Sequence, residues 1–385
     1  MDIHDYLRTL AEQQGSDLFF SVGAPVTLKR EGEFVRLNET QVLEKGQVKT
    51  LAYALMSAKQ IEEFETQLEM NLALGIAGVG RFRVNVYWQR GEVTMVVRFI
   101  SDRIASFAEL GLPRVLEKLS LLDRGLILVT GATGCGKSTT LAAMIDYRNR
   151  CRSGHIVCIE DPIEFLHHHQ CSIVDQREVG LDTHSFKAAL HNVLRESPDV
   201  IMIGEIRDRE TMQHALHYSE TGHLVLATLH ATNTVQAVER IANLFPEEAR
   251  AQVLNDISMN MVAIIGQRLA NGVKKQRLPV VEMLLRTPYI VNLIARDELH
   301  DIKAVMSRGT DDKALQTYDQ HLFRLLKARE ITLKEALRLA DSRNDLMLRA
   351  KLEDQAKDNS ESVAPAEPTS DNAAGFDSDL TEDFR

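Results

Sequence analysis

The sequence contains no long hydrophobic run. Nowhere in its 385 positions does an apolar stretch approach the roughly 20 residues that a membrane-spanning helix needs. Residues 2–14 place Ile3, Leu7 and Leu10 at helical spacing among acidic side chains, a pattern unlike that of a signal peptide. We therefore expect a cytoplasmic protein without a membrane span of its own.

Cysteine is scarce, and its spacing indicates neither a disulfide framework nor a metal site. The four cysteines are Cys135, Cys151, Cys158 and Cys171, and no two of them form a CxxC pair. We expect reduced thiols, as in proteins of a reducing compartment.

The sequence also lacks an excess of basic residues. Its net charge is −10, and residues 353–385 alone carry ten Asp or Glu against one Lys and one Arg. That segment carries a net charge of −8, so the rest of the chain, with a net charge of −2, is close to neutral. A near-neutral body offers no general electrostatic case for binding nucleic acid. Because residues 353–385 contain almost nothing to bury, we expect a disordered acidic tail there.

The composition is otherwise that of a soluble globular protein, with 44% hydrophobic and 26% charged residues. At this length the chain should form two or three folded units. Residues 1–100 predict a small α+β domain, because a helix at 2–14, short strands and two helices within 47–68 precede an alternating strand at 81–88 and its partner at 92–100. Residues 101–122 are the expected linker.

The pattern changes from residue 123, where apolar strands alternate with helices. The expected strands are 125–130, 155–159, 199–203 and 223–229, and the expected helices are 138–150, 184–195 and 208–220. Near-continuous apolar strands between helices indicate a parallel sheet covered on both faces, so residues 123–290 predict an α/β domain. The further expected elements are apolar residues at helical spacing through 247–270, a strand at 280–285, and, in a helical region over 291–352, helices near 288–296, 314–328 and 332–350.

A phosphate-binding loop joins the first of these strands to the first helix. The spacing G-x-x-x-x-G-K-S lets successive backbone N–H groups converge on phosphate oxygens at a helix N-terminus. Lys137 should reach the β- and γ-phosphates, and Ser138 should hold Mg²⁺. The expected nucleotide-binding residues are Gly131, Ala132, Thr133, Gly134, Cys135, Gly136, Lys137, Ser138 and Thr139. The thiolate of Cys135 should be favoured among these amides, so we expect alkylation of this thiol to block nucleotide binding.

Polar side chains follow three other strands of the expected sheet, where ligand contacts belong in such folds. Glu160, Asp161 and Glu164 follow the strand at 155–159 and suit contacts to Mg²⁺ or water. Glu205 ends the strand at 199–203 in the form of a Walker B acid, with Arg207 beside it. His230 follows the strand at 223–229 and is placed to sense a γ-phosphate.

Three consecutive histidines, His167 to His169, raise the question of a metal site. Adjacent histidines rarely point at one ion, and no spaced set of carboxylates or cysteines accompanies them. A solvated loop is the better interpretation.

The segments GATGCGKSTT, IEDPIEF, VIMIGEIRD and TGHLVLATLHATNT resemble the Walker A, Asp box, Walker B and His box motifs of secretion-type ATPases. Within that superfamily the chain resembles the PilT/PilU family of type IV pilus retraction ATPases over residues 1 to about 345. The resemblance implies a PAS-like N-terminal domain, a RecA-like P-loop domain, and a homohexamer that hydrolyses ATP with Mg²⁺. It also implies work beside a pilus platform protein at the inner-membrane base of the pilus.

The resemblance assigns roles to individual residues. Lys137 and Ser138 would bind phosphate and Mg²⁺, and Glu205 would help to hold the metal. Glu164 would orient the attacking water, with Glu160 as the alternative base. Two arginines on the outward face of one strand, Arg81 and Arg83, would reach the nucleotide of a neighbouring subunit.

The sequence also departs from the PilT pattern. Cys135 replaces a serine of the loop, and the C-terminal motif of PilT becomes Tyr289-Ile290-Val291-Asn292-Leu293-Ile294-Ala295-Arg296, which points to the PilU branch. A retraction motor working with a PilT-type partner is the leading hypothesis. An accessory ATP-bound ring that assists another retraction ATPase remains an alternative, as does a related secretion or DNA-transfer ATPase.

Overall fold

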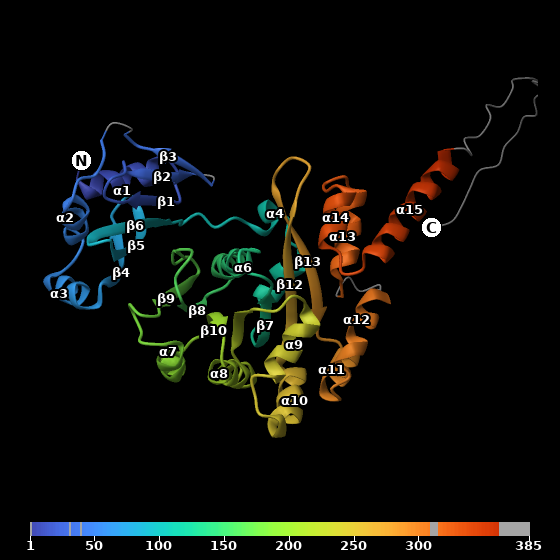
Figure 1. Cartoon of the computed structure of the whole chain (residues 1–385). Helices are drawn as coiled ribbons and strands as arrows, with labels where there is room; N and C mark the ends of the chain where they lie inside the picture. Colours follow the sequence, from blue (N-terminus) through green and yellow to red (C-terminus); the bar gives the residue numbers. More distant parts are fainter. Residues whose placement is uncertain (1, 31, 39–40, 309–314, 362–385) are drawn as a thin grey trace, which may run out of the picture.

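The computed structural model describes residues 2–30, 32–38, 41–308 and 315–361, and these residues form two β-sheets (Figure 1). The first sheet belongs to an N-terminal domain. The second is the centre of a larger α/β domain, and an extended stretch of chain followed by α4 joins the two. The mixed α/β fold class expected from the sequence is confirmed.

The N-terminal domain is a six-stranded antiparallel sheet packed with helices. Its strand order is β3-β2-β1-β6-β5-β4. The alternation expected for residues 81–88 is observed, with Phe82, Val84 and Val86 fully buried, while Trp88 is only partly buried and stacks on Phe64. The elements are α1 (Ile3–Glu12), β1 (Asp17–Phe20), β2 (Thr27–Arg30), β3 (Glu33–Arg36), α2 (Gln47–Tyr53), α3 (Ala58–Gln67), β4 (Glu69–Ile76), β5 (Gly80–Gln89) and β6 (Glu92–Ile100).

The second sheet has seven strands in the order β13-β12-β7-β11-β10-β8-β9, and all neighbours are parallel except the β12–β13 pair. Its strands and the helices between them are β7 (Gly125–Thr130), α6 (Lys137–Cys151), β8 (Gly154–Glu160), β9 (Ser172–Glu178), α7 (Phe186–Val193), β10 (Val200–Ile206), α8 (Arg209–Glu220), β11 (Leu224–Leu229), α9 (Thr234–Ala242), α10 (Arg250–Asn260), β12 (Met261–Asn271) and β13 (Arg277–Leu285). Two short 3-10 helices occupy Leu194–Glu196 and Glu247–Ala249.

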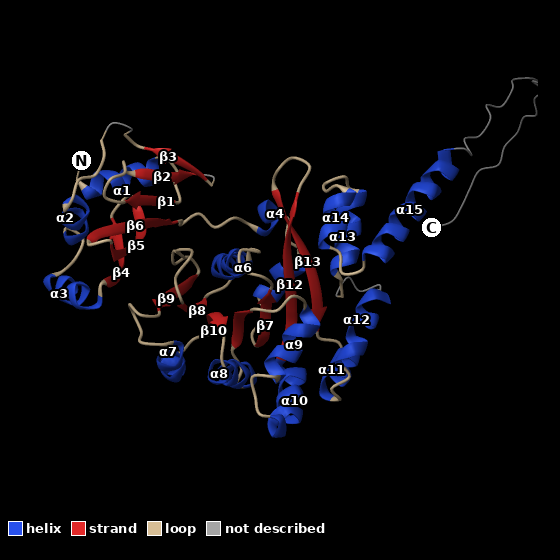
Figure 2. Ribbon diagram, viewed as in Figure 1, coloured by secondary structure: helices blue, strands red, loops and turns tan. Residues whose placement is uncertain are grey.

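Helices cover both faces of this sheet (Figure 2). On one face pack α6 and the two short helices of the linker, α4 (Phe107–Leu110) and α5 (Val115–Ser120). On the other face pack α7 to α10 and the first two helices that follow β13. Because every residue of β7 and β11 is buried, these strands read as continuous apolar runs, as expected for a sheet covered on both sides.

The prediction that helical structure continues through 247–270 is wrong in its second half. Helix α10 ends at Asn260, and Met261–Asn271 is the strand β12, paired with both β7 and β13. Residues 261–265 are apolar and most are fully buried, so their spacing does not distinguish a strand from a buried helix. Strand β9 and helix α12 (Leu299–Arg308) were not predicted either.

The C-terminal region is helical and packs beside the β12–β13 hairpin (Figure 1). It contains α11 (Pro288–Ala295), α13 (Tyr318–Lys327), α14 (Leu333–Leu339) and α15 (Arg343–Glu361). The single helix expected at 332–350 is therefore two. Helix α15 continues past residue 353, where the acidic tail was expected to begin, and residues 362–385 of that tail lie outside the described residues. Among the described helices, none has the length and apolar character that crossing a membrane would require.

Candidate active site

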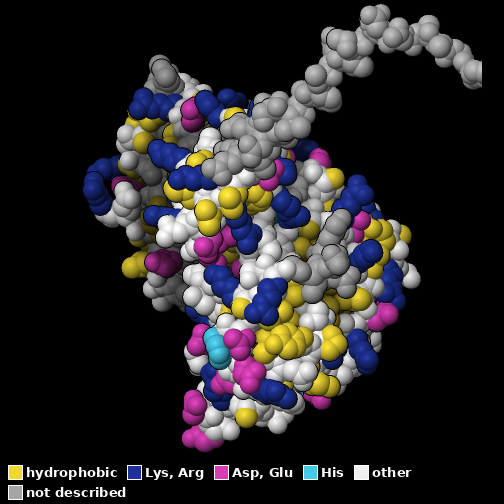
Figure 3. All heavy atoms as spheres, turned by 90° about the vertical axis from the view of Figure 1, so that its right-hand side faces the viewer, with side chains coloured by type: hydrophobic (Ala, Val, Ile, Leu, Met, Phe, Trp, Pro, Cys, Tyr) yellow, Lys and Arg dark blue, Asp and Glu magenta, His cyan; other side chains and the backbone are white. Residues whose placement is uncertain are grey.

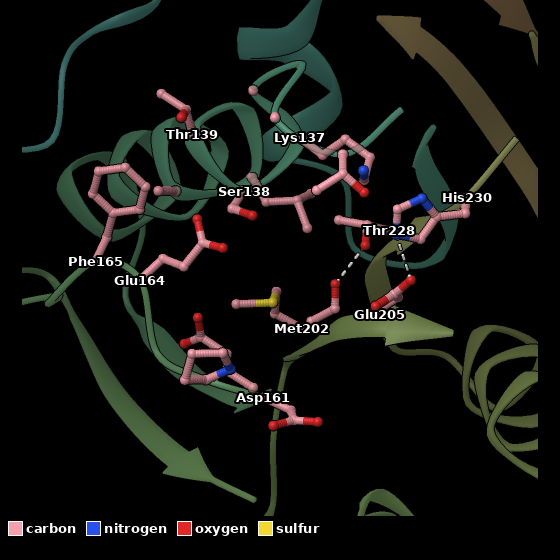
Figure 4. A pocket seen from close by; sticks show the side chains of 18 of the residues that line it. Lys137, Ser138, Thr139, Asp161, Glu164, Phe165, Met202, Glu205, Thr228 and His230 are labelled. Carbon is pink, nitrogen blue, oxygen red and sulfur yellow. Dashed lines mark hydrogen bonds and ion pairs between the residues drawn. The ribbon is translucent and has the colours of Figure 1, made fainter. Parts of the chain in front are cut away.

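A cavity of about 440 Å³ opens at the carboxyl ends of β7, β8, β10 and β11 (Figure 4). It is where the topology of a parallel sheet places a ligand site. Three of the four motif segments contribute most of its lining, and the fourth contributes Thr228 and His230. The lining residues are Thr133, Gly134, Gly136, Lys137, Ser138, Thr139, Leu141, Ala142, Glu160, Asp161, Pro162, Glu164, Phe165, His167, Met202, Gly204, Glu205, Arg207, Thr228 and His230.

The phosphate loop folds around the ammonium group of its own lysine. Lys137 is buried, and its Nζ donates to the carbonyl oxygens of Gly131 at 3.0 Å and Ala132 at 3.1 Å. Ser138 and Thr139, in the first turn of α6, line the cavity. This arrangement presents a cation, two hydroxyls and a helix N-terminus to one small volume, which suits the phosphates of a nucleotide.

Three of the expected loop residues do not line this cavity. Gly131 and Ala132 face an adjoining cavity that also contains His230. Cys135 is buried behind the loop, close to Gly131, and burial raises the pKa of its thiol despite the nearby charge of Lys137. The expectation of a favoured Cys135 thiolate is therefore wrong, because desolvation outweighs the amides and the lysine.

A glutamine that the sequence did not single out supports the loop from behind. Gln267 of β12 is buried, accepts a hydrogen bond from Thr140 Oγ1 at 2.7 Å and donates one from Nε2 to the Cys135 carbonyl at 2.9 Å. A Cβ atom on Gly136, where φ is +93°, would lie 2.9 Å from Gln267 Nε2. The sequence carries no local signal of this contact, because it arises only where residues 261–271 pair as a strand with β7.

A second glutamine organises the loop after β8. Gln176 of β9 donates from Nε2 to Glu160 Oε1 at 2.9 Å and to the Phe165 carbonyl at 2.8 Å, and it accepts from the His167 amide at 2.9 Å. Burial raises the pKa of Glu160 to about 7, although the Gln176 hydrogen bond opposes that rise. Glu164 is exposed, and Figure 4 shows its carboxylate reaching towards Ser138.

The interpretation of His167 to His169 as a solvated loop is wrong for His167. This side chain is buried in the lining of the cavity, its Nδ1 has no partner among the described residues, and burial lowers its pKa to about 4. His168 is exposed, with its Nε2 at 3.7 Å from Asp102. Within the described residues no cluster of three potential metal ligands occurs.

The Walker B glutamate is held by a histidine and an arginine. Glu205 Oε1 lies 2.8 Å from His230 Nε2, and Arg207 donates to Oε2 from Nε and Nη2, each at 2.7 Å. Arg207 also lies 3.6 Å from Asp161. Thr228, which the sequence did not single out, donates to the Gly204 carbonyl at 2.6 Å. The structure thus brings Glu205, Arg207 and His230 together on one wall of the cavity. Figure 4 shows the contact between Glu205 and His230.

The two candidate arginines are not at this cavity within the same chain. Arg81 and Arg83 lie on β5 of the N-terminal domain, on the face opposite the buried Phe82 and Val84. Arg81 Nε is buried without a hydrogen-bond partner among the described residues. Arg83 is directly opposite Arg98 on β6.

Comparison with known proteins identifies the family. Residues 3–342 match the family described as type II/IV secretion system protein. The chain is 48% identical to the type IV pilus ATPase PilU of Pseudomonas aeruginosa, over 91% of this chain and 92% of that protein, and 41% identical to the type IV pilus retraction ATPase PilT of the same organism, over 84% and 93%. A crystal structure of the pilus retraction motor PilT with bound ADP is 40% identical, covers 90% of this chain and 98% of its own, and superposes with a TM-score of 0.84. This chain therefore belongs to the PilT and PilU group of the type II/IV secretion system ATPases, and it is an ATPase.

Proposed function

We propose that this chain is the subunit of a homohexameric motor that hydrolyses ATP to retract a type IV pilus, working with a PilT-type partner. The observation that carries the proposal is 48% identity with PilU over nine-tenths of the chain. The four motifs on which ATP chemistry depends also meet at one cavity. The same likeness supports a location at the inner-membrane base of the pilus, beside a platform protein.

The phosphate loop would bind the nucleotide by exchange of hydrogen bonds. Lys137 Nζ now uses two loop carbonyls as acceptors. Phosphate oxygens carry more negative charge than carbonyls, so the ammonium would turn to them when ATP enters. Gln267 and Thr140 would keep the loop amides in place during this change.

The residues that line the cavity fit Mg²⁺ as well as the nucleotide. Ser138 and Glu205 offer the hard oxygen ligands that this ion prefers, and bound Mg²⁺ would neutralise charge that develops on the phosphates. Glu205 must first release one of the two side chains that hold it, His230 or Arg207. We infer that His230 responds to the γ-phosphate by this release.

Two carboxylates are candidates for orienting the attacking water. Glu164 is exposed and faces the phosphate loop, so it can approach a γ-phosphate freely. Glu160 is buried and tied to Gln176, and burial holds its pKa at about 7. We assign the water-orienting role to Glu164, and to Glu160 a supporting role in holding the loop.

Arg81 and Arg83 would complete the site of a neighbouring subunit. They lie far along the chain from the loop and line no part of the cavity of their own subunit. An arginine supplied by a neighbour stabilises the transition state and links hydrolysis to movement between subunits. A ring of six would provide such a neighbour for every site.

The experiment that tests the proposal is an assay of ATPase activity and particle mass for the purified protein, alone and mixed with a PilT-type ATPase. We expect a hexamer that hydrolyses ATP by itself, with Lys137→Ala as the inactive control. A ring that binds ATP but turns it over only in the mixture would favour the accessory ring instead.

A further inference from the structure

A second large cavity lies between the linker and the C-terminal helices. Its volume is about 640 Å³, and it shares no lining residue with the nucleotide cavity. Residues 111–115, at the turn from α4 into α5, form one wall. Met283 of β13, residues of α13 and of the segment just before it, and Arg349 of α15 form the rest. It therefore joins the segment that carries the N-terminal domain to the last helices of the chain.

Three arginines line this cavity, and none has a carboxylate partner among the described residues. They are Arg114, Arg324 and Arg349. In the described part of the chain no carboxylate lines the cavity and none of the three arginines forms an ion pair. Arg324 donates a hydrogen bond to Gln316 Oε1, a neutral acceptor.

Arg114 and Arg349 are exposed, whereas the guanidinium of Arg324 is partly buried, so binding an anion would stabilise the charge of Arg324 most. Burial lowers the pKa of Arg324, which shows that its charge is partly desolvated. The buried His321 accepts a hydrogen bond from the Val281 amide at 2.8 Å, and burial together with the Arg324 charge lowers its pKa to about 4, so it is neutral at pH 7. Apolar side chains, among them Leu112 and Phe323, complete the lining. A ligand with carboxylates and apolar groups would satisfy both kinds of surface.

We propose that this cavity is the docking site for the acidic C-terminal segment of the same chain, residues 362–385. Acidic residues of this segment outnumber basic ones by six to one, and three large apolar residues recur at every fourth position near its end. The acidic residues are Glu367, Asp371, Asp377, Asp379, Glu382 and Asp383, and the apolar ones are Phe376, Leu380 and Phe384. The composition thus matches the mixed basic and apolar lining.

The segment can reach the cavity. Helix α15, which contributes Arg349 to the lining, ends at Glu361, roughly 18 Å further along its axis at the usual helical rise. The residues that follow can span up to about 80 Å when extended. This is several times the distance from the end of α15 back to Arg349. The face of the molecule on this side carries Lys and Arg side chains interspersed with hydrophobic ones (Figure 3). Docking would fasten the linker to the C-terminal helices and so restrain the N-terminal domain.

Hydrogen exchange on the full-length protein tests this docking. In the wild type we expect amides of 111–116 and 316–324 to exchange at least about threefold more slowly than in the tail variant Asp377→Asn/Asp379→Asn/Glu382→Gln/Asp383→Asn. The paired variant Arg114→Glu/Arg349→Glu should lose the same protection, and a tail with lysines at those four acidic positions should restore it. Arg90→Glu, an exposed arginine of the β5–β6 turn, is the matched control and should change nothing.

Cross-linking identifies the occupant. A photoreactive residue in place of Leu380 should link to 111–115 or 316–324 within one chain, in a mixture of ¹⁵N-labelled and unlabelled protein. Linked peptide pairs with one ¹⁵N-labelled and one unlabelled member would show a link between two chains. They would assign the cavity to a second copy and overturn the proposal. Identical exchange in the wild type and the tail variant would also overturn it. Neither result depends on pilus retraction.

Discussion

Gln267 and Thr140 are joined by a hydrogen bond of 2.7 Å although 127 positions separate them in the sequence. The same glutamine donates to the Cys135 carbonyl. One side chain of β12 is therefore hydrogen-bonded to both the phosphate loop and the first turn of α6. Its neighbour Arg268 faces the other side of the strand, where it donates to the Leu339 carbonyl and forms an ion pair with Asp341. Strand β12 therefore connects the nucleotide loop to the C-terminal helices.

Gln267→Ala should weaken ATP binding more than catalysis. Losing two buried hydrogen bonds to the loop should raise KM for ATP about tenfold, with a smaller change in kcat. Steady-state ATPase kinetics measure both. Gln276→Ala, an exposed glutamine at the β12–β13 turn, is the matched control. A Gln267→Ala enzyme with unchanged KM would show that the loop keeps its shape without this support.

His230→Ala should lower kcat with little change in KM, because the side chain that His230 pairs with is Glu205, the proposed Mg²⁺ ligand. We expect a loss of about tenfold to a hundredfold in kcat. His223→Ala, at the other end of β11 and outside the cavity, is the control. Equal kcat values for the two variants would remove His230 from the mechanism.

The raised pKa of Glu160 should make the stability of the protein depend on pH. The folded pKa is about 7 and the ordinary value is 4.5, so between these values the folded protein keeps a proton that the unfolded chain releases. Stability from this group is complete below pH 4.5 and is lost as pH rises through 7, with a full range of about 3 kcal/mol.

Glu160→Gln removes this titration while leaving other groups, such as His167, in place. The melting temperature of the wild type, relative to Glu160→Gln, should therefore fall between pH 4.5 and 7. Parallel melting curves across that range would mean that Glu160 is not a desolvated carboxyl.

Subunit mixing tests whether the arginines act between subunits. Arg81→Ala/Arg83→Ala and Lys137→Ala should each reduce ATPase activity by about a hundredfold or more when assembled alone. In mixed rings some sites combine an intact loop with intact arginines from a neighbour, so part of the activity should return. A mixture no more active than its components would exclude this arrangement.

The phosphate loop and its strand could be predicted because their signals are local. Gly131 to Ser138 follow an apolar strand and precede a helix, and each feature is set by residues within one short segment. Glu160, Glu205 and His230 were also found, because strand ends of a parallel sheet converge on one edge.

The contacts that support these residues could not be predicted, because they depend on strand order. Gln267 lies on β12, which the sequence predicted to be helical, and Gln176 lies on β9, which was not predicted. The burial of individual side chains could not be predicted from the sequence either. Cys135 and His167 have polar, loop-like neighbours, yet both are covered by other parts of the fold, and that cover sets the direction of their pKa shifts.

Pilus retraction force in living cells tests the motor most directly. Cells that contain the PilT-type partner would carry the wild type, Lys137→Ala or Glu205→Ala in place of the native copy, with ATP hydrolysis by each purified protein measured in parallel. We expect both variants to lose hydrolysis and retraction force to fall with it. Unchanged force with a chain that no longer hydrolyses ATP would contradict the motor and leave an accessory ring.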